Sequence, residues 1–589
     1  MEGNPKKWGL TNPISVSIPT DHDNKLNDQL VNFLKAQDNF ESPEGSERRI
    51  RVLKHLQKVT EEFVKRCAKA KRLPQSTVDS LGGKIFTYGS YTIGVHGPDS
   101  DIDTLVVAPK IVTMDQFFEI FPPTFKEMSD PDLLTEFTSV PDAFVPIIKL
   151  EYESVSIDLI FASLPSQASI PRDFTMDDLS VLRGLDQVAM RSVNGTRVAK
   201  ELLELVPQPT AFRHALRAIK VWSKQRAIYG FVFGYPGGIA WCIMVARICQ
   251  LYPFACGATI IDKFFSLMCQ WNWKTSPVML KEVETSSILH LPVWNPTVNY
   301  SDRGHLMPVI TPAYPSMCAT HSVTHSTLAT MNAEFLRAKE IVASIQTGKK
   351  TWADLFQRHT FFTQDHKYYL SIVASCTSDK SSQDAFGGLV QSKLRLLAKG
   401  IEEGDTGIDK ARVYVKGFDR VHRCTGEAEL DRVRQGHTTY QISRDEVPQN
   451  SVSTSNGTND ETKIVWTTTW YIGLVLSEGA TKSLDISYPV EDFRRIVEDT
   501  LTFNRETMTI KIVHTRSYDL PGDVFEKSET KPTKATKSAK DKNNAKRKKV
   551  NGAKGGGKRQ FAETGLEDSG KPGKKRVSEA NGIPMSTPA

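Results

Sequence analysis

The chain has 589 residues, more than one hydrophobic core normally supports, so two to four domains are expected. Its 39% hydrophobic and 9% aromatic content is ordinary for a globular protein, and no apolar run is long enough for a membrane helix. The eight cysteines include no CxxC pair, which indicates reduced thiols and excludes a disulfide framework or a cysteine-rich zinc site.

Residues 1–206 predict an α/β domain with an N-terminal helical segment. An amphipathic piece around 27–36 precedes a long helix over 47–71, in which apolar residues recur at helical spacing. Four segments rich in β-branched residues follow, with a helix over 114–121 between the second and the third. The four segments are KIFTYGSY, DIDTLVVAP, FVPIIKLEY and VSIDLIFA. This order predicts a mixed sheet.

Residues 207–358 predict a helical central domain. The segment AFRHALRAIKVWSKQRAIYG has one apolar face, and its other side has a basic stripe of Arg213, Arg217, Lys220 and Lys224. The segment GGIAWCIMVARICQLYP is apolar nearly all round and predicts a buried helix. Further helices are predicted over 324–347 and 352–358.

Residues 359–526 predict a ferredoxin-like domain. Their order is strand, helix, strand, strand, helix, strand, which RNA-recognition modules also use. The aromatic RNP1 signature is absent, so the sequence does not predict base stacking on this sheet. The polar stretch VPQNSVSTSNGTND between two of the strands predicts a disordered loop. The fold class is therefore α+β with several domains.

The net charge of +7 is concentrated in residues 527–589, which contain 17 Lys and Arg against 6 Asp and Glu. This tail is rich in Lys, Gly, Ser and Pro and has little to bury, so we expect no fold there. Its basic runs KSAKDKNNAKRKKV and GKPGKKR predict nuclear import, with a salt-sensitive contact to RNA as a compatible second role.

The segment YGSYTIGVHGPDSDIDTL suggests chemistry. Strand side chains alternate, so Asp101 and Asp103 point the same way, and two such carboxylates repel unless they are protonated or bridged by a cation. Oxygen ligands of this kind suit Mg²⁺ or Mn²⁺. Gly89 lets the backbone approach a ligand, and Ser90 offers a hydroxyl and an N–H to a phosphate. Taken alone, a DxD motif is more often a solvated acidic turn.

A third carboxylate, Asp158, lies inside the apolar strand segment VSIDLIFA, 55 residues beyond Asp103. Burying an aspartate there is costly unless it is hydrogen-bonded, paired or bound to a metal ion. A buried aspartate satisfied by hydrogen bonds is the alternative. Together, the Gly-Ser pair, the DxD motif and the distant strand aspartate predict a two-metal phosphoryl-transfer site.

This motif order resembles that of the polymerase-β-like nucleotidyltransferases. Longer blocks, over about residues 5–525, are similar to those of eukaryotic nuclear poly(A) polymerases of the fungal type. The blocks are FTYGSYTIGVHGPDSDIDTLVVAP, SVNGTRVAKELLELVP, FGYPGGIAWCIMVARICQLYP, MPVITPAYPSM and ARVYVKGFDRVH. The resemblance implies a nucleotidyltransferase palm, a helical middle domain and an RNA-recognition-like domain. It also implies template-independent transfer of AMP from ATP to the 3′-hydroxyl of mRNA during 3′-end processing.

The resemblance assigns roles to single residues. Asp101, Asp103 and Asp158 would be the catalytic triad that binds two divalent ions, Mg²⁺ or Mn²⁺. The residues implied to contact ATP are Tyr88, Gly89, Ser90, Ser100, Lys220, Tyr229, Gly238 and Ile239, and those implied to lie near the RNA end are Lys149 and Asn194. Without the resemblance, Lys220 would be interpreted as a cation on a solvated helix face, and Tyr229 as an aromatic residue at a helix end.

Three positions depart from the family pattern: Phe231 and Ser322 stand where Asn is usual, and Thr92 stands where Arg is usual. They leave two alternatives open, a catalytically weak or inactive RNA-binding paralogue and a terminal uridylyltransferase. The C-terminal domain and the block order argue against the latter and against a CCA-adding enzyme. The implied partners are ATP, an RNA 3′ end and the cleavage and polyadenylation machinery. We expect a nuclear monomer with no membrane contact.

Overall fold

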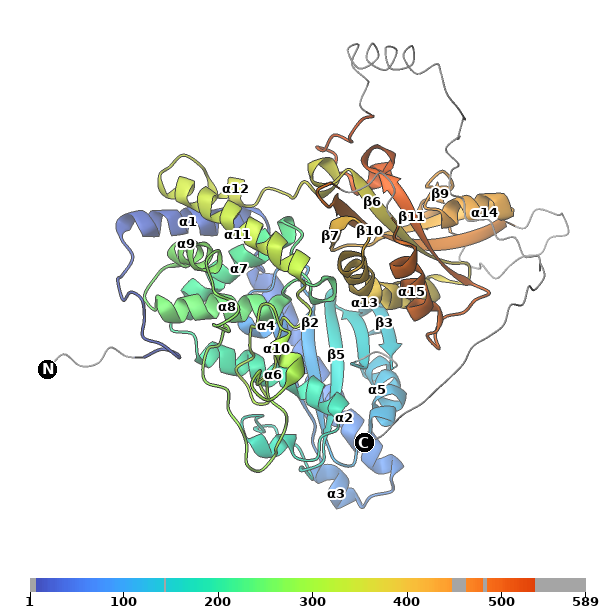
Figure 1. The fold of residues 1–589 in the computed structure, drawn as a ribbon. Helices are drawn as coiled ribbons and strands as arrows, with labels where there is room; N and C mark the ends of the chain where they lie inside the picture. The colour runs from blue at the N-terminus through green and yellow to red at the C-terminus, as the bar shows by residue number, and fades with distance from the viewer. Residues whose placement is uncertain (1–6, 142–144, 448–461, 480–484, 535–589) are drawn as a thin grey trace, which may run out of the picture. The chain divides into compact units, whose positions relative to one another are not determined.

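The computed structural model describes residues 7–141, 145–447, 462–479 and 485–534 (Figure 1). Nearly all of the predicted polar loop and most of the predicted basic tail therefore lie outside the described residues. The first of two compact units ends at Pro532, and all the elements below belong to it. Among the described helices, none combines the length and the apolar content that crossing a membrane requires.

The N-terminal helices begin earlier than their apolar patterns suggest. Helix α1 spans Asp21–Ala36, because Thr20 and Asp23 form a capping box ahead of the first apolar turn. Helix α2 spans Pro43–Ala70, with the Ser42 side chain accepting from the N–H of Gly45. A short helix, α3, spans Gln75–Ser80.

The N-terminal sheet has five strands in the order β1-β2-β5-β4-β3. Their bounds are Lys84–Thr87 (β1), Ile102–Pro109 (β2), Leu134–Val140 (β3), Ile147–Tyr152 (β4) and Val155–Leu164 (β5). Strands β2 and β5 are parallel and the other pairs antiparallel, so the predicted mixed sheet is confirmed. Strand β3 was not predicted, because LTEFTSV is a largely exposed edge strand without a buried face.

One face of this sheet packs against α2 and α5. Helix α5 spans Met114–Met128, seven residues beyond its predicted end, and continues through Pro122 and Pro123. Phe63 of α2 contacts Phe117 and Phe121 of α5 edge to face. Phe161 of β5 stacks on Phe117, so an aromatic core fixes β5 beneath the two helices.

Helices dominate the middle of the chain. The longer ones are α6 (Gln187–Glu204), α7 (Pro209–Gln225), α8 (Gly238–Leu251), α9 (Gly257–Met268) and α11 (His325–Gln346), and the short ones are α10 (Tyr300–Arg303) and α12 (Trp352–Leu355). Every residue from Ala240 to Leu251 is buried, which confirms the predicted buried helix α8. Helices α6 and α9 were not predicted.

The C-terminal sheet contains the predicted ferredoxin-like order as β6, α13, β7, β10, α15 and β11. The insertion β8–α14–β9 was not predicted. The bounds are Tyr368–Cys376 (β6), Lys380–Glu403 (α13), Ile408–Val413 (β7), Phe418–Thr425 (β8), Glu427–Arg434 (α14), Gln441–Ile442 (β9), Thr462–Leu476 (β10), Ser487–Glu498 (α15) and Met508–Arg516 (β11). Strand β10 is 15 residues long, so β7 pairs with one part of it and β8 with the other.

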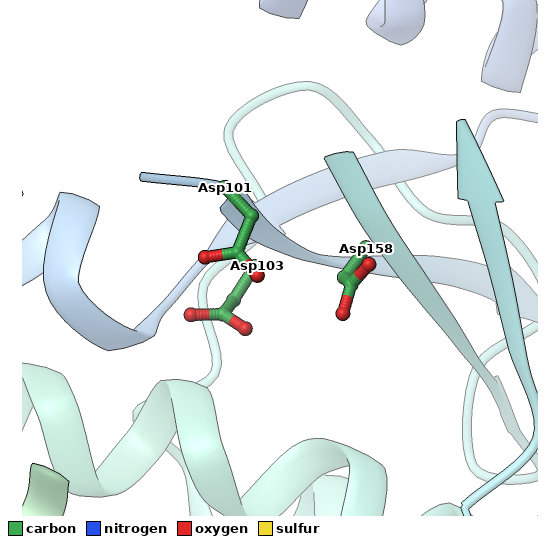
Figure 2. Close-up of side chains that lie close together, drawn as sticks. All are labelled: Asp101, Asp103 and Asp158. Carbon is green, nitrogen blue, oxygen red and sulfur yellow. The ribbon is translucent and has the colours of Figure 1, made fainter. Parts of the chain in front are cut away.

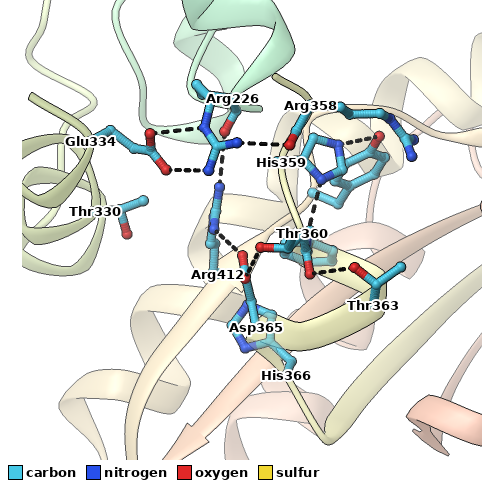
Figure 3. A network of polar contacts seen from close by, with 12 residues as sticks. Arg226, Thr330, Glu334, Arg358, His359, Thr360, Thr363, Asp365, His366 and Arg412 are labelled. Atoms are coloured by element: carbon cyan, nitrogen blue, oxygen red, sulfur yellow. Dashed lines mark hydrogen bonds and ion pairs between the residues drawn. The ribbon is translucent and has the colours of Figure 1, made fainter. Parts of the chain in front are cut away.

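A buried arginine joins the central helices to the C-terminal sheet (Figure 3). Arg226, which follows α7, donates two hydrogen bonds of 2.9 Å to the carboxylate of Glu334 in α11. It also donates to the carbonyl of Arg358 at 2.8 Å. Arg412 of β7 donates to the Arg226 carbonyl at 3.1 Å and to Asp365 at 3.2 Å. The C-terminal end of α7 is therefore fixed to the C-terminal domain. Whether the predicted domain boundaries separate units that fold alone stays a prediction.

Candidate active site

Three aspartates meet at one end of the parallel strand pair (Figure 2). Asp103 on β2 and Asp158 on β5 are direct register partners, and Asp101 immediately precedes β2. One carboxylate oxygen from each lies within 4.8 Å of the others. Ile102, between the first two, is fully buried, as strand alternation predicts. Among the described residues, this is the one group of three or more acidic, histidine or cysteine side chains that is close enough to bind a metal ion.

The negative charge of this triad is poorly balanced. Burial, together with the carboxylates of Asp101 and Asp158, raises the pKa of Asp103 to about 7. Lys149 of β4 lies opposite Asp158 in register and donates to both of its carboxylate oxygens, at 2.9 and 2.8 Å. The ammonium groups of Lys149 and, more weakly, Lys220 offset only part of this charge, because the pKa of Asp103 is still raised. Such a set of oxygen donors fits a hard divalent cation.

The predicted Gly-Ser loop is a short helix instead. Helix α4 spans Gly89–Ile93 and follows β1 directly. Its five residues are too few to show a helical period, so the sequence suggested strand and loop. Gly89 has φ +63°, and a Cβ added there would lie 1.9 Å from Oδ2 of Asp103. The backbone therefore approaches the carboxylate as closely as glycine alone permits, whereas the approach to a ligand that the sequence suggests for this residue stays a prediction.

A cavity of about 560 Å³ opens beside the triad. Its wall includes Asp101 and Asp103 from the triad and Asn194, one of the two residues implied to lie near RNA. All eight residues implied to contact ATP line it as well: Tyr88, Gly89, Ser90, Ser100, Lys220, Tyr229, Gly238 and Ile239. Lys149 lies outside the wall, at Asp158. The structure thus brings together side chains from strands and helices that are far apart in the sequence.

Lys220 and Tyr229 are half-buried in the wall of this cavity. Burial, with a smaller effect of the Lys224 ammonium, lowers the pKa of Lys220, so the interpretation of a solvated helix face is wrong for this residue. Burial raises the pKa of Tyr229 to about 12, and a Cβ added to Gly238 would lie 3.0 Å from its hydroxyl. Glycine at the start of α8 therefore makes room for the tyrosine.

Several wall residues were not predicted, among them Gly195, Lys224 and Thr311. Thr311 lies within the MPVITPAYPSM block, which could have indicated it. A Cβ added to Gly195 would lie 3.0 Å from the ring of Tyr88. The local sequence does not predict this contact between Gly195 and Tyr88, because it depends on how α6 packs beside α4.

The three departures from the family pattern lie outside the cavity wall. Phe231 is partly exposed and contacts the ring of His321 edge to face, with centroids 4.7 Å apart. The hydroxyl of Thr92 donates to that of Thr87 at 2.8 Å. Ser322 is buried, and its carbonyl accepts a hydrogen bond from Arg395.

Comparisons with known proteins agree with this geometry. Three family descriptions match the chain in succession: the poly(A) polymerase nucleotidyltransferase domain (residues 9–206), central domain (211–358) and predicted RNA binding domain (360–534). Poly(A) polymerase PAPa of Candida albicans is 45% identical over 92% of this chain and 98% of its own length. Poly(A) polymerase pla1 of Schizosaccharomyces pombe is 45% identical over 90% of this chain and 96% of its own.

Solved structures of a more distant enzyme also align. A structure of the RNA terminal uridylyl transferase Cid1 is 14% identical and has a TM-score of 0.39 over 57% of this chain and 99% of its own. That similarity is too low to bear on the substrate.

Proposed function

The chain belongs to the poly(A) polymerase family, and on that premise we propose how its site performs the reaction. The protein is a template-independent polynucleotide adenylyltransferase, which adds AMP from ATP to the 3′ end of mRNA. The main support for our assignment of the site is the triad of Asp101, Asp103 and Asp158 at the edge of the cavity.

The three aspartates would hold two divalent ions, Mg²⁺ or Mn²⁺. Bound there, the ions would acidify the attacking 3′-hydroxyl and offset charge on the leaving pyrophosphate. Asp103 and Asp158 are held opposite each other by the strand register, Asp101 lies on the other side of buried Ile102, and Asp158 would complete the site near the attacking hydroxyl. The raised pKa of Asp103 supports this assignment, because three carboxylates at this range are stable only with added positive charge or a proton.

The cavity holds ATP beside the triad. Tyr88, Gly89 and Ser90 bind the nucleotide where α4 begins, and the ammonium group of Lys220 attracts the triphosphate. Tyr229 and the Gly238-Ile239 entry to α8 bound the remaining part of the cavity. Enclosure strengthens these electrostatic contacts, since fewer water molecules compete with them.

The RNA end reaches the triad from the side of Lys149 and Asn194. Asn194 lines the cavity, and Lys149 lies at the Asp158 carboxylate, where its charge can also bind an RNA phosphate. We further propose that the protein is nuclear and works as a monomer with the cleavage and polyadenylation machinery. The fungal relatives and the basic runs of the tail support the nuclear location. An inactive paralogue has no structural support, because the three departures lie outside the cavity wall.

The test is extension of an unstructured RNA oligomer with each NTP separately, in Mg²⁺ or Mn²⁺. We expect a ladder with ATP, and a loss of rate on the order of 10⁴-fold in Asp103→Ala, as for other residues that touch reacting atoms. Asp115→Ala, at an exposed aspartate of α5, is the matched control and should extend normally. Undiminished extension by Asp103→Ala would contradict the assignment of the site, and a ladder with UTP alone would contradict the function.

A further inference from the structure

The loop of residues 94–101 determines where Asp101 lies. It connects α4 to β2 and contains no helix or strand. Asp103 and Asp158 are held by the register of two paired strands, whereas Asp101 precedes the first residue of β2 and is exposed. The position of this third carboxylate therefore depends on what holds the loop.

Arg49 of α2 holds the second half of the loop, and 3% of its side chain is exposed. Its guanidinium donates to the carbonyls of Ser100 and Pro98, both at 2.7 Å, and to that of Gly97 at 3.3 Å. The Ser100 carbonyl belongs to the peptide group that joins Ser100 to Asp101. A planar fork with five N–H donors suits this task, because it reaches several acceptors from one rigid group.

Two arginines of α7 hold the beginning of the loop. Arg213 donates to the carbonyl of Ile93 at 2.9 Å, and Arg217 to those of Gly94 and His96 at 3.0 and 2.7 Å. Two arginines of the basic stripe seen in the sequence are therefore used inside the protein. Their donors face main-chain carbonyls. The same helix contains Lys220, so the loop and the cavity wall share one support.

We propose that Arg49 is a positioning residue for the adenylyl transfer, which keeps Asp101 where the cation site needs it. The inference rests on the proposed role of the triad as that site. Without Arg49, the Ser100 and Pro98 carbonyls would lose this donor, and the Gly97 carbonyl would keep only the N–H of Ser100 at 3.1 Å. Asp101 would then sample positions outside the 4.8 Å cluster. A site whose ligands are not held in place binds its ion less tightly.

The competing explanation is that Arg49 serves only to balance Glu41. The Arg49 Nε donates to Oε2 of Glu41 at 2.7 Å, and Oε1 of that carboxylate accepts from the N–H of Ser42 at 2.9 Å. Both side chains of the pair are buried, so breaking it costs stability whatever the loop does. The two explanations differ in what they predict for Glu41, because Arg49 is the member of the pair that donates to the loop carbonyls.

The experiment measures Mn²⁺ binding to the full chain by electron paramagnetic resonance, without RNA or nucleotide. In Arg49→Met we expect the Kd for Mn²⁺ to rise about 10- to 100-fold, the usual effect of removing a residue that orients a metal ligand. Hydrogen exchange over residues 94–101 should become faster, and kcat should fall while the KM for RNA changes little. Arg49→Lys should give an intermediate Kd. The ammonium group of lysine lacks the planar fork of the guanidinium and cannot reach all three carbonyls at once.

Two control variants separate positioning from stability. Glu41→Gln removes the charge partner and leaves the loop contacts, so its Mn²⁺ affinity should stay close to that of the wild type even if its Tm falls. Arg51 lies on α2 like Arg49, and its surface ion pair is with Glu153. Arg51→Gln should change neither the Mn²⁺ affinity nor the Tm.

A wild-type Kd and wild-type loop exchange in Arg49→Met would overturn the inference. If Arg49→Met does not fold, a wild-type Kd in Arg49→Lys overturns it equally. Normal Mn²⁺ binding by a wild-type chain that extends no RNA would contradict the proposed function, and the Kd values of the variants would still decide whether Arg49 holds Asp101 at the cation site.

Discussion

Arg420 on β8 and Asp103 on β2 are both ionisable groups on a central strand, but their surroundings differ. Arg420 has 2% of its side chain exposed, and Asp523 accepts two hydrogen bonds from it at 2.6 and 2.9 Å. The hydroxyl of Thr469 accepts a third at 2.9 Å. Asp103 instead faces two further carboxylates, which help to raise its pKa to about 7. The positive charge of Arg420 on β8 is therefore balanced, whereas the negative charge around Asp103 on β2 is not.

The neighbouring His422 extends the contrast. Burial lowers the pKa of this histidine to about 4, so it is neutral, and its Nε2 lies 3.1 Å from the hydroxyl of Thr467. Arg420 and His422 of the six-stranded sheet are thus paired or neutral, which suits a role in stabilising this part of the fold. Unbalanced charge at the end of strands β2 and β5 of the five-stranded sheet costs stability, and such sites are where binding and catalysis are commonly found.

Apart from the loss of a triad carboxylate itself, the largest effect on the catalytic side should come from Gly89→Ala. The new Cβ would collide with Oδ2 of Asp103, so the carboxylate must move. The alanine would also have to adopt φ +63°, which is unfavourable for a residue with a Cβ. We expect the rate of AMP incorporation to fall about 100-fold, as for other displacements of roughly 1 Å at a reacting site. The control is Gly388→Ala in α13, where an added Cβ has no neighbour within 4 Å, and there we expect unchanged activity. Equal rates in both variants would contradict the close approach at Gly89.

On the supporting side, Arg420→Met should reduce stability and leave chemistry intact. Removing one member of a buried pair costs about 3 kcal/mol, toward the lower end for such pairs because 38% of Asp523 remains exposed. Chemical denaturation should show the loss, while the rate per folded molecule under saturating RNA stays near that of the wild type. A large fall in kcat with unchanged stability would mean that this sheet takes part in the reaction.

A smaller effect is expected from Lys149→Met, which removes the ammonium group that partly balances the triad. With 48% of the Lys149 side chain exposed, the pair with Asp158 is worth at most about 1 kcal/mol. We therefore expect Mn²⁺ to bind a few-fold more tightly, as the cation no longer competes with the lysine. The affinity for RNA should fall in the same variant, because one phosphate contact is lost. Weaker Mn²⁺ binding would contradict the competition.

Much of the site could be predicted from local sequence patterns. Strand alternation places Asp101 and Asp103 on one side, and an aspartate within an apolar segment identifies Asp158. The register that sets Asp158 opposite Asp103 could not be read from the chain, because β2 and β5 are far apart in the sequence and pair through long-range packing.

The failures have physical reasons of the same kind. Helical periodicity showed that Arg213 and Arg217 lie on the polar side of α7, but it cannot tell whether water or main-chain carbonyls face them. The five-residue helix α4 and the edge strand β3 are too short or too exposed to leave a periodic pattern. The insertion β8–α14–β9 was not predicted, because it depends on β10 pairing with β8 as well as with β7. The ferredoxin-like order of strands and helices does not include that second pairing.

The contrast between the two sheets depends on the triad requiring a cation, and Mn²⁺ binding measured between about pH 6 and pH 8 tests this. Burial and like charge raise the pKa of Asp103 from its ordinary value to about 7, so below pH 7 the ion must displace a proton. The affinity of the wild type should rise about tenfold for each pH unit up to 7 and then level off. The matched variant Asp103→Asn should bind weakly at every pH. Mn²⁺ binding that is independent of pH, or equal in the two proteins, would contradict the assignment of the triad.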